Sequence, residues 1–262
     1  MAYPPRCVRS AIVTSAPTPA PTSVTPQGVA LSPFRALRPS VTAARLATLL
    51  CPPYDVIDEA LRRELIAADP DNAVTVILPE AAGNTERYAA ARERMDSWVS
   101  SGLFTVDPEP ALYVYEMADR DGAVTRGLLG ALTLRDPADG VILPHEDTMA
   151  GPVADRLAVM MATEANLEPI YLVYDGGGAA SRAVANVDGT PPLAATTTRD
   201  GVSHRLWALR ESDQLASIAA DLARRHALIA DGHHRYATYR EMQARLTAER
   251  GPGPWDRGLT LL

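Results

Sequence analysis

Two adjacent histidines and an arginine open a helical pattern in the segment LIADGHHRY, residues 228–236. An apolar run precedes the Asp-Gly pair, so the segment predicts a strand, a turn and then a helix. The free N–H groups at a helix start attract anions, and histidine and arginine side chains add further phosphate ligands. We therefore expect a phosphate or nucleotide site formed by Gly232, His233, His234 and Arg235.

Asp231 ends the predicted strand, where its carboxylate is placed to bind Mg²⁺ or to orient a histidine in a catalytic role. The alternative is that Asp231 only caps the helix and that the two histidines are surface residues. Two histidines and an arginine at one helix start are unusual for capping alone, and this favours the functional interpretation.

A second polar segment, LPHEDT, follows another short apolar run at residues 143–148. Glu146 is a candidate general base that takes a proton from a hydroxyl group, and His145 is a candidate to orient it or to contact a phosphate. Asp147 and Thr148 are better explained as caps of the following helix. A zinc-protease motif is excluded, because no second histidine follows one helical turn later.

The composition excludes several kinds of phosphate site. All 25 residues of the Lys+Arg total are arginines. A P-loop, a protein-kinase fold and a pyridoxal-phosphate enzyme each need a lysine, so none of them fits this chain. Any phosphate must be held by arginine, histidine, backbone N–H groups or a metal ion.

Charge, hydropathy and cysteine usage narrow the function classes further. A net charge of −7 argues against a nucleic-acid partner, and no apolar run is long enough to predict a membrane span. Cys7 and Cys51 are too few for a disulfide framework, which favours a reducing cytoplasm.

Hydrophobic periodicity indicates which elements position these residues. Residues 1–30, rich in Pro, Ala, Thr and Ser, predict a disordered tail. The spacing predicts helices at 58–68, 84–100, 153–164, 212–225 and 233–249. It predicts strands at 74–78, 111–117, 125–134, 141–143, 170–174, 203–209, 227–230 and 258–262, with weak β structure over 179–210 and no helix directly after the glycines at 176–178.

These elements predict one α+β domain over residues 31–262. A division into an N-terminal subdomain, 31–135, and a core, 136–262, that carries an insertion at 175–210 is left open. The chain stops inside an apolar, strand-like run at 258–262, which leads us to expect a C-terminally shortened protein.

From residue 31 onward the chain resembles an uncharacterised bacterial and archaeal family labelled domain of unknown function 1015. The segments that carry the resemblance are PFRALRP (33–39), PPYDV (52–56), ALYVY (111–115), LPHEDT (143–148), DRL (155–157) and IADGHHRY (229–236). Members of that family are usually longer. Tyr54 and Asp55 lie on a rigid Pro-Pro turn, which suits either a structural role or the fixing of a side chain near a pocket. Asp155 and Arg156 either form an ion pair with one another or point toward the site, and the resemblance, which includes them, favours the site.

The pair of segments PHE and DGHHR also resembles the archaeal free serine kinases of the ParB/sulfiredoxin-like superfamily. This resemblance implies a mixed-sheet core with additional strands and helices, Glu146 as the base toward the serine hydroxyl, and Asp231–Arg235 around the phosphates of ATP or ADP with Mg²⁺. The two segments lie much further apart here than in those kinases, with residues 170–210 between them.

Three function classes follow. The first is a nucleotide-dependent kinase that acts on the hydroxyl of free serine or a related hydroxy amino acid. The second is a metal-dependent phosphoester hydrolase, with Zn²⁺ or Mn²⁺ bound by nitrogen and oxygen atoms of His145, Glu146, Asp231, His233 and His234. Against it, the adjacent His233 and His234 point in different directions on a helix. The third is an inactive nucleotide-binding or regulatory protein. Each implies a small-molecule ligand rather than nucleic acid or a membrane, and self-association is left open.

Overall fold

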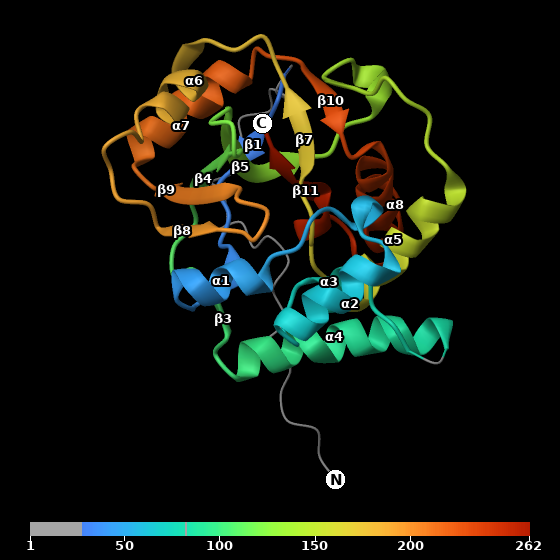
Figure 1. Ribbon diagram of the computed structural model, residues 1–262. Coiled ribbons are helices and arrows are strands. Elements are labelled where there is room, and N and C mark those ends of the chain that lie inside the picture. Colours follow the sequence, from blue (N-terminus) through green and yellow to red (C-terminus); the bar gives the residue numbers. More distant parts are fainter. Residues whose placement is uncertain (1–27, 82) are drawn as a thin grey trace.

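A mixed nine-stranded β-sheet is the centre of the computed structural model, which describes residues 28–81 and 83–262 (Figure 1). The strand order is β6-β10-β7-β11-β5-β4-β9-β8, and β1 pairs with β5 outside this path. The pairs β6–β10 and β7–β11 are parallel, and the other pairs are antiparallel. The bounds are β1 Leu31–Ser32, β4 Leu112–Ala118, β5 Val124–Thr133, β6 Ile142–Leu143, β7 Ile170–Val173, β8 Ala194–Thr197, β9 Ser203–Leu209, β10 Ala227–Asp231 and β11 Arg257–Leu261.

The helices of the described residues lie around this sheet, and the expected α+β class with a mixed sheet is confirmed. Their bounds are α1 Ala43–Leu49, α2 Glu59–Ala68, α3 Val74–Ile77, α4 Asn84–Ser100, α5 Ala150–Thr163, α6 Gly178–Ala185, α7 Ser212–Leu222 and α8 His233–Arg250. Three short 3-10 helices, η1 Tyr54–Val56, η2 Pro137–Asp139 and η3 Pro254–Asp256, and a two-stranded ribbon of β2 Leu37–Pro39 with β3 Phe104–Val106 complete the fold.

The main hydrophobic core fixes the strands and the helix that carry the DGHHR segment. Ile229 of β10, Leu172 of β7 and Ile142 of β6 are buried in it together with Tyr239 and Met242 of α8. Burial of large apolar side chains is the main favourable contribution to folding. The start of α8 is therefore held on a rigid base.

A second core belongs to the N-terminal helices, which lie together at one end of the molecule (Figure 1). Val76 of α3 packs there with Met95 and Trp98 of α4.

Strands from before and after residue 135 lie side by side in the sheet, since β5 pairs with β11. The boundary at 135 stays a prediction.

Most predicted elements are confirmed, including the hairpin of β4 and β5 and the strand β11, which lies between β5 and β7. None of the helices in the described residues has the length and apolar character that a bilayer span requires.

The predicted tail falls mainly on residues 1–27, which lie outside the described residues. The prediction that the disordered tail extends to residue 30 was wrong, because Val29 is buried and its N–H donates to the carbonyl of Arg225 at 2.9 Å.

The predicted strand at 74–78 was wrong, because residues Val74–Ile77 form the short helix α3. The side chain of Asn72 accepts a hydrogen bond from the N–H of Val74 at 2.9 Å, and the Thr75 hydroxyl donates to the Asn72 carbonyl at 2.8 Å. These local hydrogen bonds, made at the residue before the N-cap Ala73, override the β preference of a Val-Thr-Val-Ile run.

The prediction of weak β structure over 179–210 was wrong for its first part, where α6 follows the glycines directly. Gly177 and Gly178 have φ of 74° and 73°, a region that favours glycine. Asp221 of α7 then accepts a hydrogen bond from the N–H of Ala180 at 3.0 Å. The side chain that stabilises this helix start therefore comes from 41 residues away, where local sequence patterns do not reveal it.

Candidate functional site

The predicted strand, turn and helix at DGHHR are confirmed as β10, Gly232 and α8. Gly232 has φ 92° and ψ 33°, and an added Cβ would lie 3.2 Å from both Ile170 and Arg235 side-chain atoms. The first helical hydrogen bond runs from the N–H of Tyr236 to the Gly232 carbonyl at 2.8 Å, and no side chain caps this helix start. The N–H groups of residues 233–235 therefore point out of the first turn, as an anion site requires.

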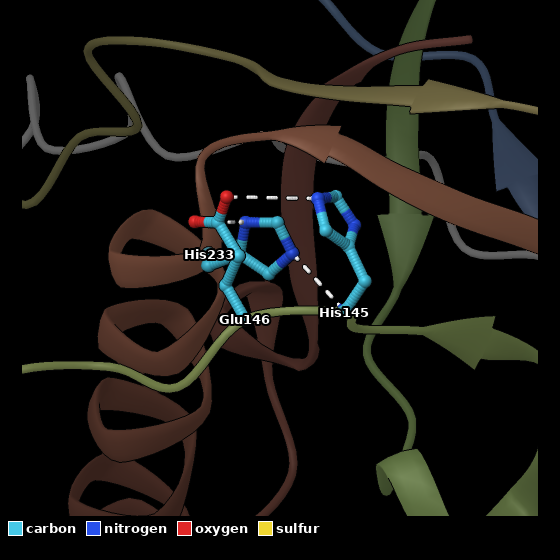
Figure 2. A group of neighbouring side chains, drawn as sticks. All are labelled: His145, Glu146 and His233. Carbon is cyan, nitrogen blue, oxygen red and sulfur yellow. Dashed lines mark hydrogen bonds and ion pairs between the residues drawn. The ribbon is translucent and has the colours of Figure 1, made fainter.

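Glu146 lies directly beside this helix start (Figure 2). Its Oε2 is 3.6 Å from Nδ1 of His233, and its Oε1 is 3.6 Å from Nε2 of His145. The two imidazole rings meet edge to face, with centroids 4.5 Å apart. The fold thus brings together residues from the PHE and DGHHR segments, which are distant in sequence.

His233 is held in one orientation and in one protonation state. Its side chain is only 4% exposed, and its Nε2 accepts a hydrogen bond from the N–H of His145 at 3.3 Å. Burial, together with the nearby His145, lowers the pKa of His233. A neutral ring that accepts at Nε2 carries its proton on Nδ1, and that N–H faces Glu146.

His234 holds the other end of the same loop. Its Nε2 accepts a hydrogen bond from the N–H of Met149 at 3.1 Å, so the two histidines of α8 fasten residues 145 and 149 to the helix start. Phosphate binding by these imidazoles stays a prediction. What the structure establishes is that they position the loop that carries Glu146.

Arg235 points inward rather than into solvent. It is buried and donates to the Pro169 carbonyl and to the Asp231 carboxylate, so it ties the end of β10 to the residue before β7. Arg235 therefore supports the turn. A direct contact between its guanidinium and a phosphate, and Mg²⁺ binding by Asp231, stay predictions.

The other residues that the sequence singled out form a second group. The Arg156 guanidinium lies 4.5 Å from the centre of the Tyr54 ring and donates to the Ile77 carbonyl at 2.6 Å. Asp155 accepts from Arg156 at 2.6 Å and from Tyr88 at 2.8 Å. Asp55 lies exposed on the same 3-10 turn as Tyr54.

Glu168 joins the two groups, and sequence reasoning missed it. Its Oε1 accepts from the N–H of Tyr54 at 3.1 Å, and its Oε2 is 3.9 Å from Arg156. A cavity of about 20 Å³ lies between Glu168, Arg156 and Arg235. Burial raises the pKa of Glu168, although the two arginines act in the opposite direction. Its only sequence signal is an acid shortly before a buried strand, which is too common to single it out.

Among the described residues, His145, Glu146 and His233 form a group with the geometry of a metal site, with ligand atoms within 4.8 Å of one another. Asp231 and His234 are outside this group. A metal ion on Nδ1 of His233 would need the proton on Nε2, where the His145 N–H already donates. The group as it stands therefore fits a histidine–carboxylate pair better than a metal centre.

The family model described as "Protein of unknown function (DUF1015)" matches residues 31–262. The chain belongs to the DUF1015 family. The match covers both groups of this DUF1015 protein, from the Tyr54 turn to the start of α8. Searches of curated proteins and of solved structures find no match.

Proposed function

We propose that this DUF1015 protein transfers a phosphoryl group from a nucleotide to the hydroxyl of a small molecule, with free serine or a related hydroxy amino acid as the substrate class. One observation carries the proposal: the Glu146 carboxylate lies 3.6 Å from His233, the first residue of α8. A proton acceptor and a helix start suited to phosphate are thus within reach of one bound substrate, which positioning catalysis requires.

Glu146 acts as the general base. Its side chain is 62% exposed, so a substrate hydroxyl can approach it, and its ion-pair partners among the described residues are His145 and His233. The Nδ1–H of His233 orients the carboxylate. The hydroxyl proton moves to Glu146 as the substrate oxygen forms a bond to the terminal phosphorus of the nucleotide. The bond from that phosphorus to the bridging oxygen breaks, and the nucleotide leaves one phosphate shorter.

The start of α8 binds the phosphates. Three outward N–H groups and the positive end of the helix dipole stabilise the charge that spreads over the transferred group, and this arrangement needs no lysine. The half-exposed carboxylate of Asp231 is an oxygen ligand suited to Mg²⁺, which would neutralise phosphate charge when it is bound with ATP or ADP.

A ParB/sulfiredoxin-like core is part of the same proposal. The strands β6 and β10 are parallel and both lead toward the site, with Leu143 at the end of β6 paired with Leu228, three residues before the end of β10; this arrangement supports the assignment. We also place the protein in the cytoplasm, because Cys51 is a free thiol and the cysteine content is low.

The group of ligand atoms at His145, Glu146 and His233 favours a second candidate, a metal-dependent phosphoester hydrolase. It ranks below the transferase because the His145–His233 hydrogen bond places a proton on the nitrogen that would bind the metal.

The test is an incubation of the protein with Mg²⁺, either ATP or ADP, and a panel of hydroxy amino acids, with ³¹P NMR and mass spectrometry of the products. A phosphorylated amino acid supports the proposal. Nucleotide binding without product would favour an inactive nucleotide-binding protein. Phosphoester cleavage that needs Zn²⁺ or Mn²⁺ but no nucleotide would favour the hydrolase.

A further inference from the structure

Three apolar side chains form an exposed row across neighbouring strands. Leu228 of β10 is the register partner of Leu143 on β6 and of Val173 on β7. These side chains are 39%, 39% and 38% exposed, respectively. Because neighbouring strands lie about 4.8 Å apart, the row is roughly 10 Å wide.

The opposite side of the same strands is buried. Ile142, Ile229 and Leu172 are 0%, 1% and 0% exposed and belong to the main core. Since side chains alternate between the faces of a strand, this part of the sheet has one covered face and one open apolar face.

The open face leads directly to the candidate site. Leu143 lies two residues before His145, and Leu228 lies three residues before Asp231, which are distances of about 7 Å and 10 Å along extended chain. Tyr171 is the partner of Asp231 on β7, and it lies on the same face as Val173, two residues away. Tyr171 thus lies on β7 between Val173 and the strand end that leads into the helix start.

We propose that this row, defined as Leu143, Leu228 and Val173, binds the base of the nucleotide whose phosphates lie at the start of α8. This inference rests on the proposed function. A nucleotide is anionic at one end and flat and largely apolar at the other. The surface has the same division, with outward N–H groups and histidines at one end and the apolar row at the other.

The physical basis is removal of apolar surface from water. In this arrangement the aliphatic side chains cover one face of the base, and Tyr171, two residues from Val173 on the same strand, supplies an aromatic ring to stack against it. Such contacts do not distinguish strongly among bases, so both adenine and guanine nucleotides are expected to bind.

The experiment separates the base from the phosphates by measuring ADP, ATP and inorganic tripolyphosphate affinities by calorimetry. Leu228→Ser and Val173→Ser are each expected to weaken nucleotide binding about tenfold and to leave tripolyphosphate binding unchanged. Val124→Ser is the matched control, because Val124 is also an exposed β-strand valine, 56% accessible, but lies at the tip of the β4–β5 hairpin.

Unchanged nucleotide affinity in both row variants would overturn the inference while leaving the phosphate site intact. A row variant that alters sedimentation but not nucleotide affinity would also overturn it, since it would identify a second copy of the chain as the occupant. If neither ADP nor tripolyphosphate binds the wild-type protein, the proposed function itself fails and the base site fails with it.

Discussion

The backbone N–H of His145 donates to Nε2 of His233 across 3.3 Å, and these two residues are 88 positions apart in the sequence. The bond has two consequences. It fastens the loop that carries Glu146 to the first turn of α8, and it leaves the proton of the neutral imidazole on Nδ1, facing the Glu146 carboxylate. His233 is therefore a positioning residue for the proposed base.

Two substitutions at His233 test separately the hydrogen bond from the His145 N–H and the contact of Nδ1–H with Glu146. His233→Gln keeps an acceptor near the Nε2 position, whereas His233→Asn keeps a donor near the Nδ1 position. Each is expected to lower kcat of phosphoryl transfer about tenfold or more, because each removes one of the two contacts that orient Glu146. The measurement is steady-state kinetics, with His226→Gln as the control at a surface histidine. Wild-type kcat in both His233 variants would contradict the positioning role.

The lowered pKa of His233 predicts a dependence of stability on pH. The pKa of the unfolded histidine is near the ordinary value of 6.5, and the pKa of the folded one is lower. The unfolded chain therefore binds more protons between these two values, so this contribution is complete above about pH 6.5 and is lost as the pH falls toward the folded pKa. Urea denaturation from pH 8 to 5 should show a smaller acid loss of stability in His233→Gln. His204, whose pKa is lowered in the same direction, stays in both proteins and cancels in the comparison. Parallel curves for the two proteins would refute the assignment.

Arg235→Lys tests whether the buried guanidinium group of Arg235 stabilises the fold. A lysine cannot hold both the Pro169 carbonyl and the Asp231 carboxylate in the geometry of a guanidinium group, so we expect the free energy of unfolding to fall by about 2–4 kcal/mol. Arg240→Lys on the same helix is the matched control. Its pair with Asp136 is solvent-exposed, so a change below about 1 kcal/mol is expected. Equal effects in urea denaturation would show that Arg235 has no special structural role.

Glu168→Gln keeps an acceptor for the Tyr54 N–H but removes the buried charge. The pKa of Glu168 is raised in the folded protein above its ordinary value of 4.5, so the wild-type side chain loses stabilising free energy as the pH rises through the folded pKa. The free energy of unfolding of the variant should therefore rise relative to that of the wild type as the pH increases from about 4.5 through the folded pKa. Denaturation curves at several pH values measure this difference. A variant that loses stability relative to the wild type over that range would show that the ion pair with Arg156 outweighs burial.

Local patterns were enough to predict the strand, turn and helix around Gly232, because an Asp-Gly turn between an apolar run and a helical pattern leaves few alternatives. Local patterns also identified Glu146 as a candidate general base. They did not reveal the His145–His233 bond or the role of Glu168, since both depend on segments that meet only in the folded chain. The error at α3 has a local origin, in the hydrogen bonds of Asn72 directly before the helix, whereas the error at α6 depends on the distant Asp221.

The most direct test of the account is single-turnover phosphoryl transfer by Glu146→Gln. Glu146 is exposed, so the variant should fold and bind ADP or ATP as the wild type does, which calorimetry verifies. The account predicts that the rate of transfer to the hydroxy amino acid falls by about 100-fold or more, because the substitution removes the proton acceptor. Transfer by Glu146→Gln within a factor of about three of the wild-type rate would contradict the assignment of Glu146 as the base.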